Sequence, residues 1–536
     1  MSETRHDVVI LGGGLAGLCL ALQLRRRFPG IGVRVLERRA HPLPPAAHKV
    51  GESSVEIGAH YFDTVLGLSE HLDSQHIRKF GFRFFYSEGR EDLPALTELG
   101  VRRVFPRPTY QLDRGIFENF LGEEARRSGA EFLDGAVVRR VDIATDGTDH
   151  TVSYEHEGET HVARARWVVD AAGRANILKR KFDLAEPNGH DANSVWFRID
   201  DKLELDQWCN DERWRLECDP PERWRSTNHF CGPGYWVWLI PLGSGAHSVG
   251  IVCDAAMHPL ETMNSFDKAM EWLRQYQPLI WRECDKRRDK LLDFKFLRGF
   301  SHGCKQVFSG DRWAITGEAG VFLDPFYSPG TDFIAISNTY ITELVARERA
   351  GDSIEMHAHI FEQIYFSFYE STLALYRDQY AMFGDAEAMP AKVIWDYAYY
   401  WGILCQFFFQ HRLTDIVSLS RLKKELSAAQ AINLRVQELL RAWAGAQQPP
   451  NPARLLDQAA LPWFAELNRS LGDPLDDAGF QARIRRNTAL LHELAAEILA
   501  RARQAVPGID AAALEQALVD IAAVPASAPL LFRPAA

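Results

Sequence analysis

The chain begins with a short apolar run and a glycine-rich turn, and this stretch restricts the fold more than any other. Residues 7–11 are apolar and rich in β-branched residues, which predicts a buried parallel strand. Gly12, Gly14 and Gly17 then give the spacing G-x-G-x-x-G, and an apolar stretch typical of a helix follows them. This strand, turn and helix predict a Rossmann-type α/β domain.

Each part of this turn has a physical role toward a dinucleotide. The glycines permit a tight turn, a close backbone approach to a pyrophosphate and close packing of the helix on the strand. Residues at the helix start, including Leu15 and Ala16, offer amides and the positive end of the helix dipole to the phosphates. A second strand, residues 33–37, ends at Glu37, where a carboxylate accepts hydrogen bonds from a ribose. The sequence therefore predicts an adenine dinucleotide site.

Composition narrows the class of protein. The 536 residues suffice for about three domains. The net charge of -11 argues against a nucleic-acid or anionic-membrane partner, because both favour a basic surface. The eight cysteines contain no C-x-x-C pair, which disfavours a disulfide framework and a zinc site and predicts a cytoplasmic protein. No signal peptide is expected, because the first apolar run is a five-residue strand.

Lys79 lies in a stretch with two interpretations. Residues 79–85 alternate as a strand does, with Lys79, Gly81 and Arg83 on one face and phenylalanines on the other. On this pattern alone, a solvated lysine is the more common reading. Before it, residues 51–54 form a polar loop that is expected to begin a helix over 55–66.

The middle and the end of the chain change in character. Residues 234–241 and 247–253 predict a hairpin, with Trp236 and Trp238 on one face, either as core or as a rigid wall. Beyond residue 350 the pattern is helical throughout. The aromatic stretch 395–409 is too short and too polar for a membrane span, so core or pocket lining is favoured.

Several motifs resemble the flavin-dependent halogenases, a family with the flavoprotein monooxygenase fold. Trp236, Trp238, Ile240 and Pro241 match its W-x-W-x-I-P signature. A second element, F-x-x-P-x-x-S-x-G, is matched by Phe322, Pro325, Ser328 and Gly330, and K-x-G-x-x-F begins at Lys79. The resemblance covers about residues 5–345. The long helical tail is similar in layout to the pyrrolnitrin-pathway pyrrole halogenase.

The resemblance implies a Rossmann-type FAD-binding domain, a β-sheet substrate domain and a C-terminal helical region. The FAD-binding domain is expected at 1–55, 105–185 and 300–345, the sheet domain at 56–104 and 186–299, and the helices at 346–536. Reduced FAD, oxygen and chloride or bromide would give hypohalous acid, and Lys79 would direct the halogen to an electron-rich phenol or pyrrole. A separate NAD(P)H-dependent flavin reductase would supply the reduced flavin.

The resemblance also assigns roles to particular residues. Trp236 and Trp238 would separate the substrate from the flavin, and Ser328, Gly330 and Thr331 would hold the halide. No metal site is expected, and the oligomeric state stays open, with a homodimer as one option. The cofactor contacts are expected from Gly12, Gly14, Leu15, Ala16, Gly17, Glu37, Lys49, Glu52, Ser53, Ser54, Arg114, Asp170, Gly317, Glu318, Pro325 and Gly330.

Three positions depart from the family's pattern. Tyr327 replaces the glutamate of tryptophan halogenases, which argues for a more electron-rich ring than tryptophan's. Glu318 replaces an aspartate beside the flavin ribityl chain. Pro329 lacks the N–H that the family often offers to the halide, which predicts weaker chloride binding or a preference for bromide.

Two other functions compete with halogenation. An aromatic hydroxylase would leave Lys79 with a structural role and would add oxygen without any need for halide. A flavin-binding sensor or assembly partner would bind FAD without turnover. The motifs together favour the halogenase.

Overall fold

The computed structural model describes residues 3–44, 51–446, 451–519 and 529–533. These residues form two compact units, each built around its own sheet. The first unit comprises Met1–His76, Leu112–Gly189 and Ser301–Tyr369, and the second comprises the remaining segments. Each unit is described by itself below.

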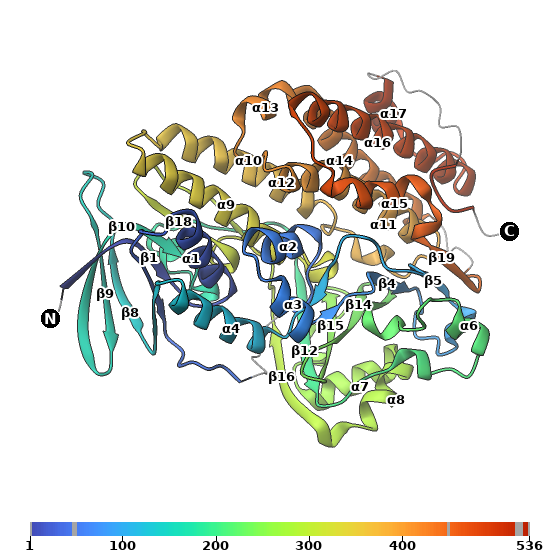
Figure 1. The fold of residues 1–536 in the computed structure, drawn as a ribbon. Coiled ribbons are helices and arrows are strands. Elements are labelled where there is room, and N and C mark those ends of the chain that lie inside the picture. Colours follow the sequence, from blue (N-terminus) through green and yellow to red (C-terminus); the bar gives the residue numbers. More distant parts are fainter. Residues whose placement is uncertain (1–2, 45–50, 447–450, 520–528, 534–536) are drawn as a thin grey trace. The chain divides into compact units, whose positions relative to one another are not determined.

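The first unit contains a seven-stranded sheet with the order β7-β2-β1-β10-β9-β8, and β18 also pairs with β10. The pairs β7-β2, β2-β1, β1-β10 and β10-β18 are parallel. The strands β10, β9 and β8 then form an antiparallel meander (Figure 1). The strands are β1 Glu3–Leu11, β2 Val33–Glu37, β7 Glu131–Asp134, β8 Val137–Asp142, β9 His150–His156, β10 Glu159–Asp170 and β18 Trp313–Ile315, with a small ribbon of β11 Ala185–Glu186 and β17 Gly303–Cys304.

In the first unit, α4 and α9 pack against α1, which follows the glycine turn, and α2 packs against α9. The expected helix over 55–66 begins as α2 and continues as a π-helix, Tyr61–Val65. The helices are α1 Leu15–Arg27, α2 Glu56–His60, α3 Ser69–Gln75, α4 Arg114–Arg127, α5 Ile177–Lys181 and α9 Gly330–Arg349, and α10 Glu355–Leu373 leads out of the unit.

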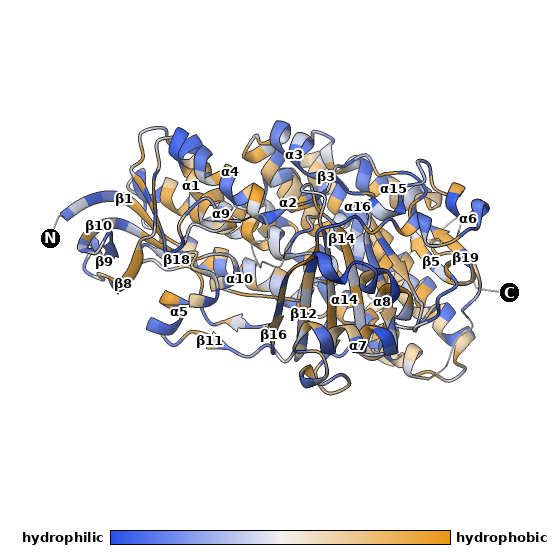
Figure 2. Ribbon diagram, turned by 90° about the horizontal axis from the view of Figure 1, so that it is seen from below, coloured by the Kyte–Doolittle hydropathy of each residue, from blue (hydrophilic) through white to orange (hydrophobic). Residues whose placement is uncertain are grey.

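The second unit contains an eight-stranded sheet with the order β16-β12-β15-β14-β13-β4-β5-β19. One face packs on α7 and α8, and α7 carries both hydrophilic and hydrophobic residues along its length (Figure 2). The strands are β4 Phe82–Phe85, β5 Thr97–Gly100, β12 Ala192–Ile199, β13 Thr227–Gly232, β14 Tyr235–Pro241, β15 His247–Asp254, β16 Leu291–Leu297 and β19 Arg454–Asp457, beside the pair β3 Ile77–Arg78 and β6 Tyr110–Gln111.

The C-terminal helices belong to the second unit. Among the described residues, none of the helices is both long enough and apolar enough to cross a membrane. The helices of this unit are α6 Glu212–Leu216, α7 Phe266–Tyr276, α8 Pro278–Asp285, α11 Ala388–Tyr399, the π-helix Tyr400–Leu404, α12 Cys405–Phe409, α13 Ile416–Arg421, α14 Lys423–Gly445, α15 Pro462–Arg469, α16 Asp477–Ala505 and α17 Ala512–Val519.

Two expectations about elements were wrong. The stretch 79–85 is not one strand: β3 ends at Arg78, β4 begins at Phe82, and Gly81 between them has a φ of +74°. The region beyond 350 is not helical throughout, because β19 pairs in parallel with β5. The strand β19 has only four residues, and its partner lies more than 350 positions earlier. A segment this short shows no periodic pattern by which a strand could be predicted.

The division into units differs from the three expected domains. The C-terminal helices from Glu370 onward group with the eight-stranded sheet, and residues 56–76 group with the seven-stranded sheet. The expected segments of the FAD-binding domain, 1–55, 105–185 and 300–345, remain a prediction.

Candidate functional site

The turn after β1 leaves no room for side chains. Gly12 has a φ of +110°, and a Cβ there would lie 2.5 Å from the carbonyl oxygen of Ala171. A Cβ on Gly17 would lie 2.1 Å from the carbonyl oxygen of Gly12. Gly14 is the N-cap of α1, so the amides of Leu15, Ala16 and Gly17 lie in its first turn. The tight turn that Gly12 and Gly17 permit makes the start of α1 a cradle of amides, and such a cradle fits the pyrophosphate of a dinucleotide.

Four strands end together beside this turn. Leu11 is in register with Leu36 on β2 and with Asp170 on β10, and Asp170 is in register with Ile315 on β18. The carboxyl ends of parallel strands are where open α/β sheets bind ligands. At the end of β2, Glu37 accepts a hydrogen bond of 2.7 Å from the amide of Gly13, which holds its carboxylate at the turn.

Asp170 shapes the loop that follows β10. Its two carboxylate oxygens accept hydrogen bonds from the amides of Ala172, at 3.0 Å, and Leu178, at 2.7 Å. Burial raises the pKa of this carboxyl to about 6, although those amides favour its charged form. In this structure Asp170 therefore acts on its own loop, and the backbone of that loop lies against Gly12.

The loop after β18 also reaches the start of α1. Gly317 has a φ of +62°, and a Cβ there would lie 2.8 Å from the Cβ of Ala16 at the start of α1. Glu318 forms an ion pair of 2.5 Å with Arg174, and each side chain is one-third exposed. The loops after β10 and β18 thus converge on the glycine turn and the first turn of α1.

The polar loop 51–54 is tied to the start of α4. The Nη1 of Arg114 donates to the carbonyl oxygen of Gly51 at 3.3 Å, and the same guanidinium pairs with Glu118 one turn along α4. The amide of Leu112 donates to the carbonyl oxygen of Glu52 at 2.6 Å. Glu52, Ser53 and Ser54 are buried, and Lys49 lies outside the described residues.

The expected halide residues form the N-terminus of α9. Ser328 has a φ of +53°, Pro329 is the N-cap, and Gly330 and Thr331 begin the helix. The Oγ1 of Thr331 is buried and has no hydrogen-bond partner among the described residues. Gly58 on α2 leaves room for it, since a Cβ there would lie 2.3 Å from that oxygen. A helix of 20 residues gives this end an anion-attracting dipole.

Two other residues of this element are placed by the turn before α9. Pro325 begins a 3₁₀ turn, Pro325–Tyr327, whose N-cap is Asp324. The carboxylate of Asp324 accepts a hydrogen bond from the amide of Phe326 at 2.9 Å. Tyr327 ends the turn and is 9% exposed. Pro325 thus fixes the approach of the chain to α9.

Lys79 belongs to the second unit and is 3% exposed, which contradicts the solvated reading. Its Nζ lies 3.3 Å from the centroid of the Phe82 ring. The expected strand would have placed these two side chains on opposite faces. The left-handed turn at Gly81 interrupts the alternation and brings both to one side.

The two tryptophans lie on one face of β14, as their spacing predicted. Their ring centroids are 5.7 Å apart, and both rings are buried. Trp236 Nε1 donates to Tyr380 Oη at 3.0 Å, and Trp238 Nε1 donates to Ser248 Oγ at 3.1 Å. Gly250 on β15 makes space for the second ring, because a Cβ there would lie 2.1 Å from it.

A row of rings connects this wall to the lysine within the second unit. The His229 ring lies 4.9 Å from Trp236, 4.8 Å from Phe84 and 5.3 Å from Phe82, centroid to centroid. Phe82 in turn lies 6.1 Å from Tyr397 on α11. The aromatic stretch of the C-terminal helices therefore reaches the surroundings of Lys79, in agreement with core or pocket lining.

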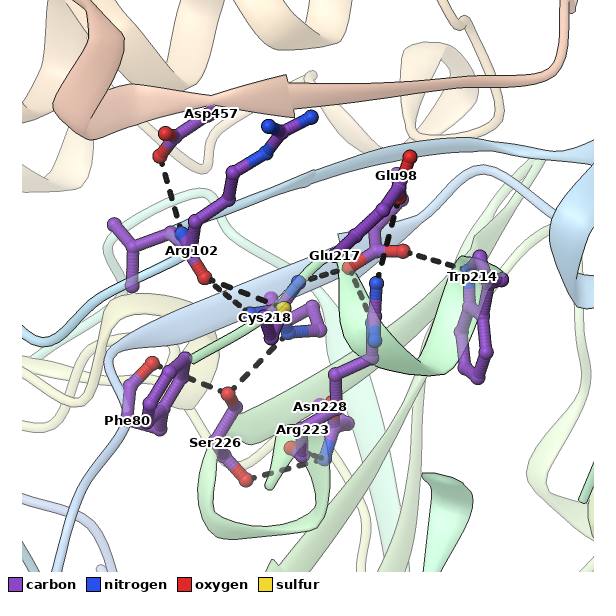
Figure 3. A network of polar contacts seen from close by, with 12 residues as sticks. Phe80, Glu98, Arg102, Trp214, Glu217, Cys218, Arg223, Ser226, Asn228 and Asp457 are labelled. Atoms are coloured by element: carbon purple, nitrogen blue, oxygen red, sulfur yellow. Dashed lines mark hydrogen bonds and ion pairs between the residues drawn. The ribbon is translucent and has the colours of Figure 1, made fainter. Parts of the chain in front are cut away.

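A buried charge network holds the strands next to Lys79 (Figure 3). Glu98 on β5 pairs with Arg83 of β4 and with Arg223, at 3.0 Å from the Nε of Arg223, and it also accepts from Trp214 Nε1 at 3.0 Å. The Arg223 guanidinium stacks over the Trp214 ring. These charged side chains are almost fully buried.

The same network reaches the main chain around Lys79. Ser226 Oγ donates to the carbonyl oxygen of Phe80 at 3.1 Å, and Arg83 Nη2 donates to the carbonyl oxygen of Val101 at 2.6 Å (Figure 3). Sequence reasoning missed this network and the Phe82 contact. The signal in the sequence was Arg83, which the alternation of residues 79–85 placed on one face with Lys79, where a solvated side chain is the more common reading.

Comparison with known proteins agrees with this geometry. Residues 5–259 match the family described as an FAD binding domain. The chain is 26% identical over 471 residues to a flavin-dependent halogenase of Dictyostelium discoideum, which covers 79% of this chain and 76% of that protein. It is 28% identical over 338 residues to a 1H-pyrrole-2-carbonyl peptidyl-carrier protein brominase of Pseudoalteromonas luteoviolacea, over 62% and 75% of the two chains.

Solved structures share the fold. The halogenase PltM in complex with phloroglucinol and FAD matches with a TM-score of 0.64 and 19% identity, over 92% of this chain and 96% of that chain. The α/β fold class and the resemblance to flavin-dependent halogenases predicted from the sequence are confirmed.

Proposed function

We propose that this protein, an FAD-binding oxidoreductase similar to the flavin-dependent halogenases, uses reduced FAD, oxygen and chloride or bromide to halogenate an electron-rich aromatic substrate. The observation that carries the proposal is the position of Lys79. Its ammonium is buried over an aromatic ring, in a unit that also carries the paired tryptophans Trp236 and Trp238.

The cofactor would be held by the residues that converge on α1. The amides of Leu15, Ala16 and Gly17 would bind the pyrophosphate, Glu37 the ribose, and Arg114 and the loop 51–54 the far side of the flavin. Gly317, Glu318 and Pro325 would contact its remaining atoms. When bound in reduced form, FAD supplies with oxygen the two-electron oxidant that converts a halide to hypohalous acid.

The halide would bind at the start of α9. The amides of Gly330 and Thr331, the Thr331 hydroxyl, Ser328 and the helix dipole offer donors and positive potential to an anion. Pro329 removes one donor from this set. We therefore propose that bromide is favoured over chloride, because a more weakly hydrated anion loses less when one hydrogen bond is missing.

Lys79 would act on the hypohalous acid. Its ammonium donates a hydrogen bond to the oxygen of that acid, which polarises the oxygen–halogen bond. A carbon of the substrate ring would attack the halogen while the oxygen takes a proton from Lys79 and leaves as water, and the proton that the ring then loses would restore the ammonium. Trp236 and Trp238 would keep the substrate away from the flavin, so that halide is the species oxidised.

The substrate proposed is a phenol or a pyrrole. Tyr327 supports this, because the glutamate that tryptophan halogenases carry there would stabilise charge on a less reactive ring. One similar protein is named for a pyrrole bound to a carrier protein, and a similar structure contains phloroglucinol. We also propose that a separate NAD(P)H-dependent flavin reductase supplies reduced FAD.

Mass spectrometry of an electron-rich phenol tests the function. Purified protein is incubated with the phenol, FAD, a flavin reductase, NADH, oxygen and bromide, beside a bromide-free control and Lys79→Ala. The proposal expects a product with a bromine isotope doublet from the wild type only. A product that gains one oxygen without any need for bromide, equally in both proteins, would show a hydroxylase instead.

A further inference from the structure

The ammonium of Lys79 and the face of Phe82 are in direct contact. Nζ lies 3.3 Å from the ring centroid, and each side chain is 3% exposed. A desolvated ammonium over a phenyl face is attracted by the negative face of the ring quadrupole. Phe82 is not part of the K-x-G-x-x-F motif, whose phenylalanine is Phe84.

Hydrogen bonds fix the main chain at Lys79. The position of Nζ therefore depends on the conformation of the lysine side chain. The amide of Lys79 donates to the carbonyl oxygen of Thr109 at 2.8 Å, and the amide of Phe80 donates to that of Arg225 at 3.2 Å. The guanidinium of Arg225 donates in turn to the carbonyl oxygen of Arg78 at 2.9 Å. What remains to be fixed is a flexible four-carbon stem.

Neighbouring rings hold Phe82 itself. Its centroid lies 5.3 Å from His229, 6.1 Å from Phe84 and 6.1 Å from Tyr397. A ring enclosed on these sides keeps its face in one orientation, because core side chains are close-packed. The face that meets the ammonium is therefore preformed.

We propose that Phe82 is a positioning residue for Lys79, holding the ammonium in the place where the halogen is delivered, and that an unactivated phenyl ring is required there. The inference rests on the proposed function. A ring this close to the ammonium also lies close to the electrophilic halogen. A phenol reacts with such halogen far more readily than a phenyl ring does.

Fluorination of Phe82 tests the positioning role without changing the shape of the side chain. Site-specific incorporation of mono-, di- and trifluorophenylalanine at position 82 weakens the negative ring face step by step. The readout is the ratio of hypohalous acid captured by a diffusing trap to halogenated phenol. We expect that ratio to rise with each fluorine, by about tenfold overall, while the rate of reduced-flavin oxidation stays constant.

Phe85 is the matched control for this series. It is buried in the same strand, stacks on Phe230 at 4.8 Å, and belongs to the core cluster on the other face of the sheet. The same fluorinated residues at position 85 should leave the ratio unchanged. An unchanged ratio across the Phe82 series, in protein that halogenates the phenol, would overturn the positioning role. If the wild type forms no halogenated product, the proposed function fails first.

Phe82→Tyr tests the need for an unactivated ring. Hypohalous acid should exchange a ring hydrogen of the introduced phenol for halogen, with water as the other product. Peptide mass spectrometry after turnover with bromide should find the bromine isotope doublet on the peptide that contains position 82. Phe85→Tyr should gain none. Absence of label at position 82, in a variant that still brominates the substrate, would contradict the inferred placement of the halogen.

Discussion

The region around the glycine turn and the region around Lys79 are held in different ways. The first is defined by backbone: Gly12 and Gly17 admit no Cβ, the loop after β10 lies against both of them, and the loop after β18 lies against Ala16. The second is defined by side chains: Glu98 pairs with two buried arginines, and the ammonium of Lys79 lies over the Phe82 ring. A site made of backbone leaves a fixed spacing in the sequence. A site made of side chains depends on partners that the fold brings together.

The largest effect is expected from Glu98→Gln. The substitution removes the carboxylate that pairs most closely with Arg83 and Arg223, and leaves Arg223 with Asp206 at 3.7 Å and Glu217 at 3.6 Å, which costs about 3–5 kcal/mol. Urea unfolding should show this loss in the midpoint. Glu271→Gln, which breaks an exposed pair with Arg274 on α7, is the control and should leave the midpoint unchanged. A stable Glu98→Gln protein would show that the network contributes little.

Gly17→Ala tests the backbone side of the comparison. The added Cβ would meet the Gly12 carbonyl oxygen at 2.1 Å, so α1 must shift away from the turn. We expect FAD affinity to fall about 100-fold, since the amides that face the pyrophosphate move with the helix. Gly30→Ala, where no atom lies within 4 Å of the new Cβ, should bind FAD normally. Equal affinities in titrations of the two variants would refute the cradle.

Thr331→Val removes the buried hydroxyl at the start of α9 while keeping the shape of the side chain. If that hydroxyl donates to the halide, the KM for bromide should rise about tenfold, which is the value of one hydrogen bond to a charged group. Thr331→Ser should retain wild-type KM. Steady-state kinetics at varied bromide decide this. A KM that stays constant in Thr331→Val would assign the hydroxyl no part in halide binding.

Acid should destabilise the two units by a similar amount. Burial lowers the pKa of His302 in the first unit and of His247 in the second to about 3, each helped by nearby cations. The unfolded chain binds protons at these histidines below about pH 6.5, so the stability present above that pH is lost as pH falls toward 3.

Each of these histidines contributes a slope of up to about 1.4 kcal/mol per pH unit. His302→Gln and His247→Gln should each flatten the pH dependence of the urea midpoint by a similar amount. If the pH dependence of the urea midpoint changes in only one of the two variants, the two units differ in their sensitivity to acid.

Much of the region around the glycine turn could be predicted from the sequence, but little of the region around Lys79 could be. The glycine spacing located the turn, and the acidic strand end located Glu37. The tryptophan pair was predicted because residues two apart share a face of a strand. These inferences needed only local periodicity.

The side-chain region was harder to predict because its interactions join distant segments. The turn at Gly81 interrupts the strand and brings Lys79 and Phe82 together, although the alternation placed them on opposite faces. Glu98 and Arg223 are 125 positions apart, and β19 pairs with a strand more than 350 positions earlier. In the sequence alone, Glu98 and Arg223 are charged residues of the kind expected at the surface, because their partners lie far away along the chain.

The central claim is that the two regions carry separable steps, with oxidant formed at the flavin and halogen delivered by Lys79. Oxygen-dependent oxidation of bound reduced FAD and formation of brominated phenol should be measured together in Lys79→Met, which retains most of the side-chain volume. We predict flavin oxidation within about twofold of the wild type and bromination reduced at least about 100-fold. Equal losses in both rates, or bromination that survives the substitution, would contradict the claim.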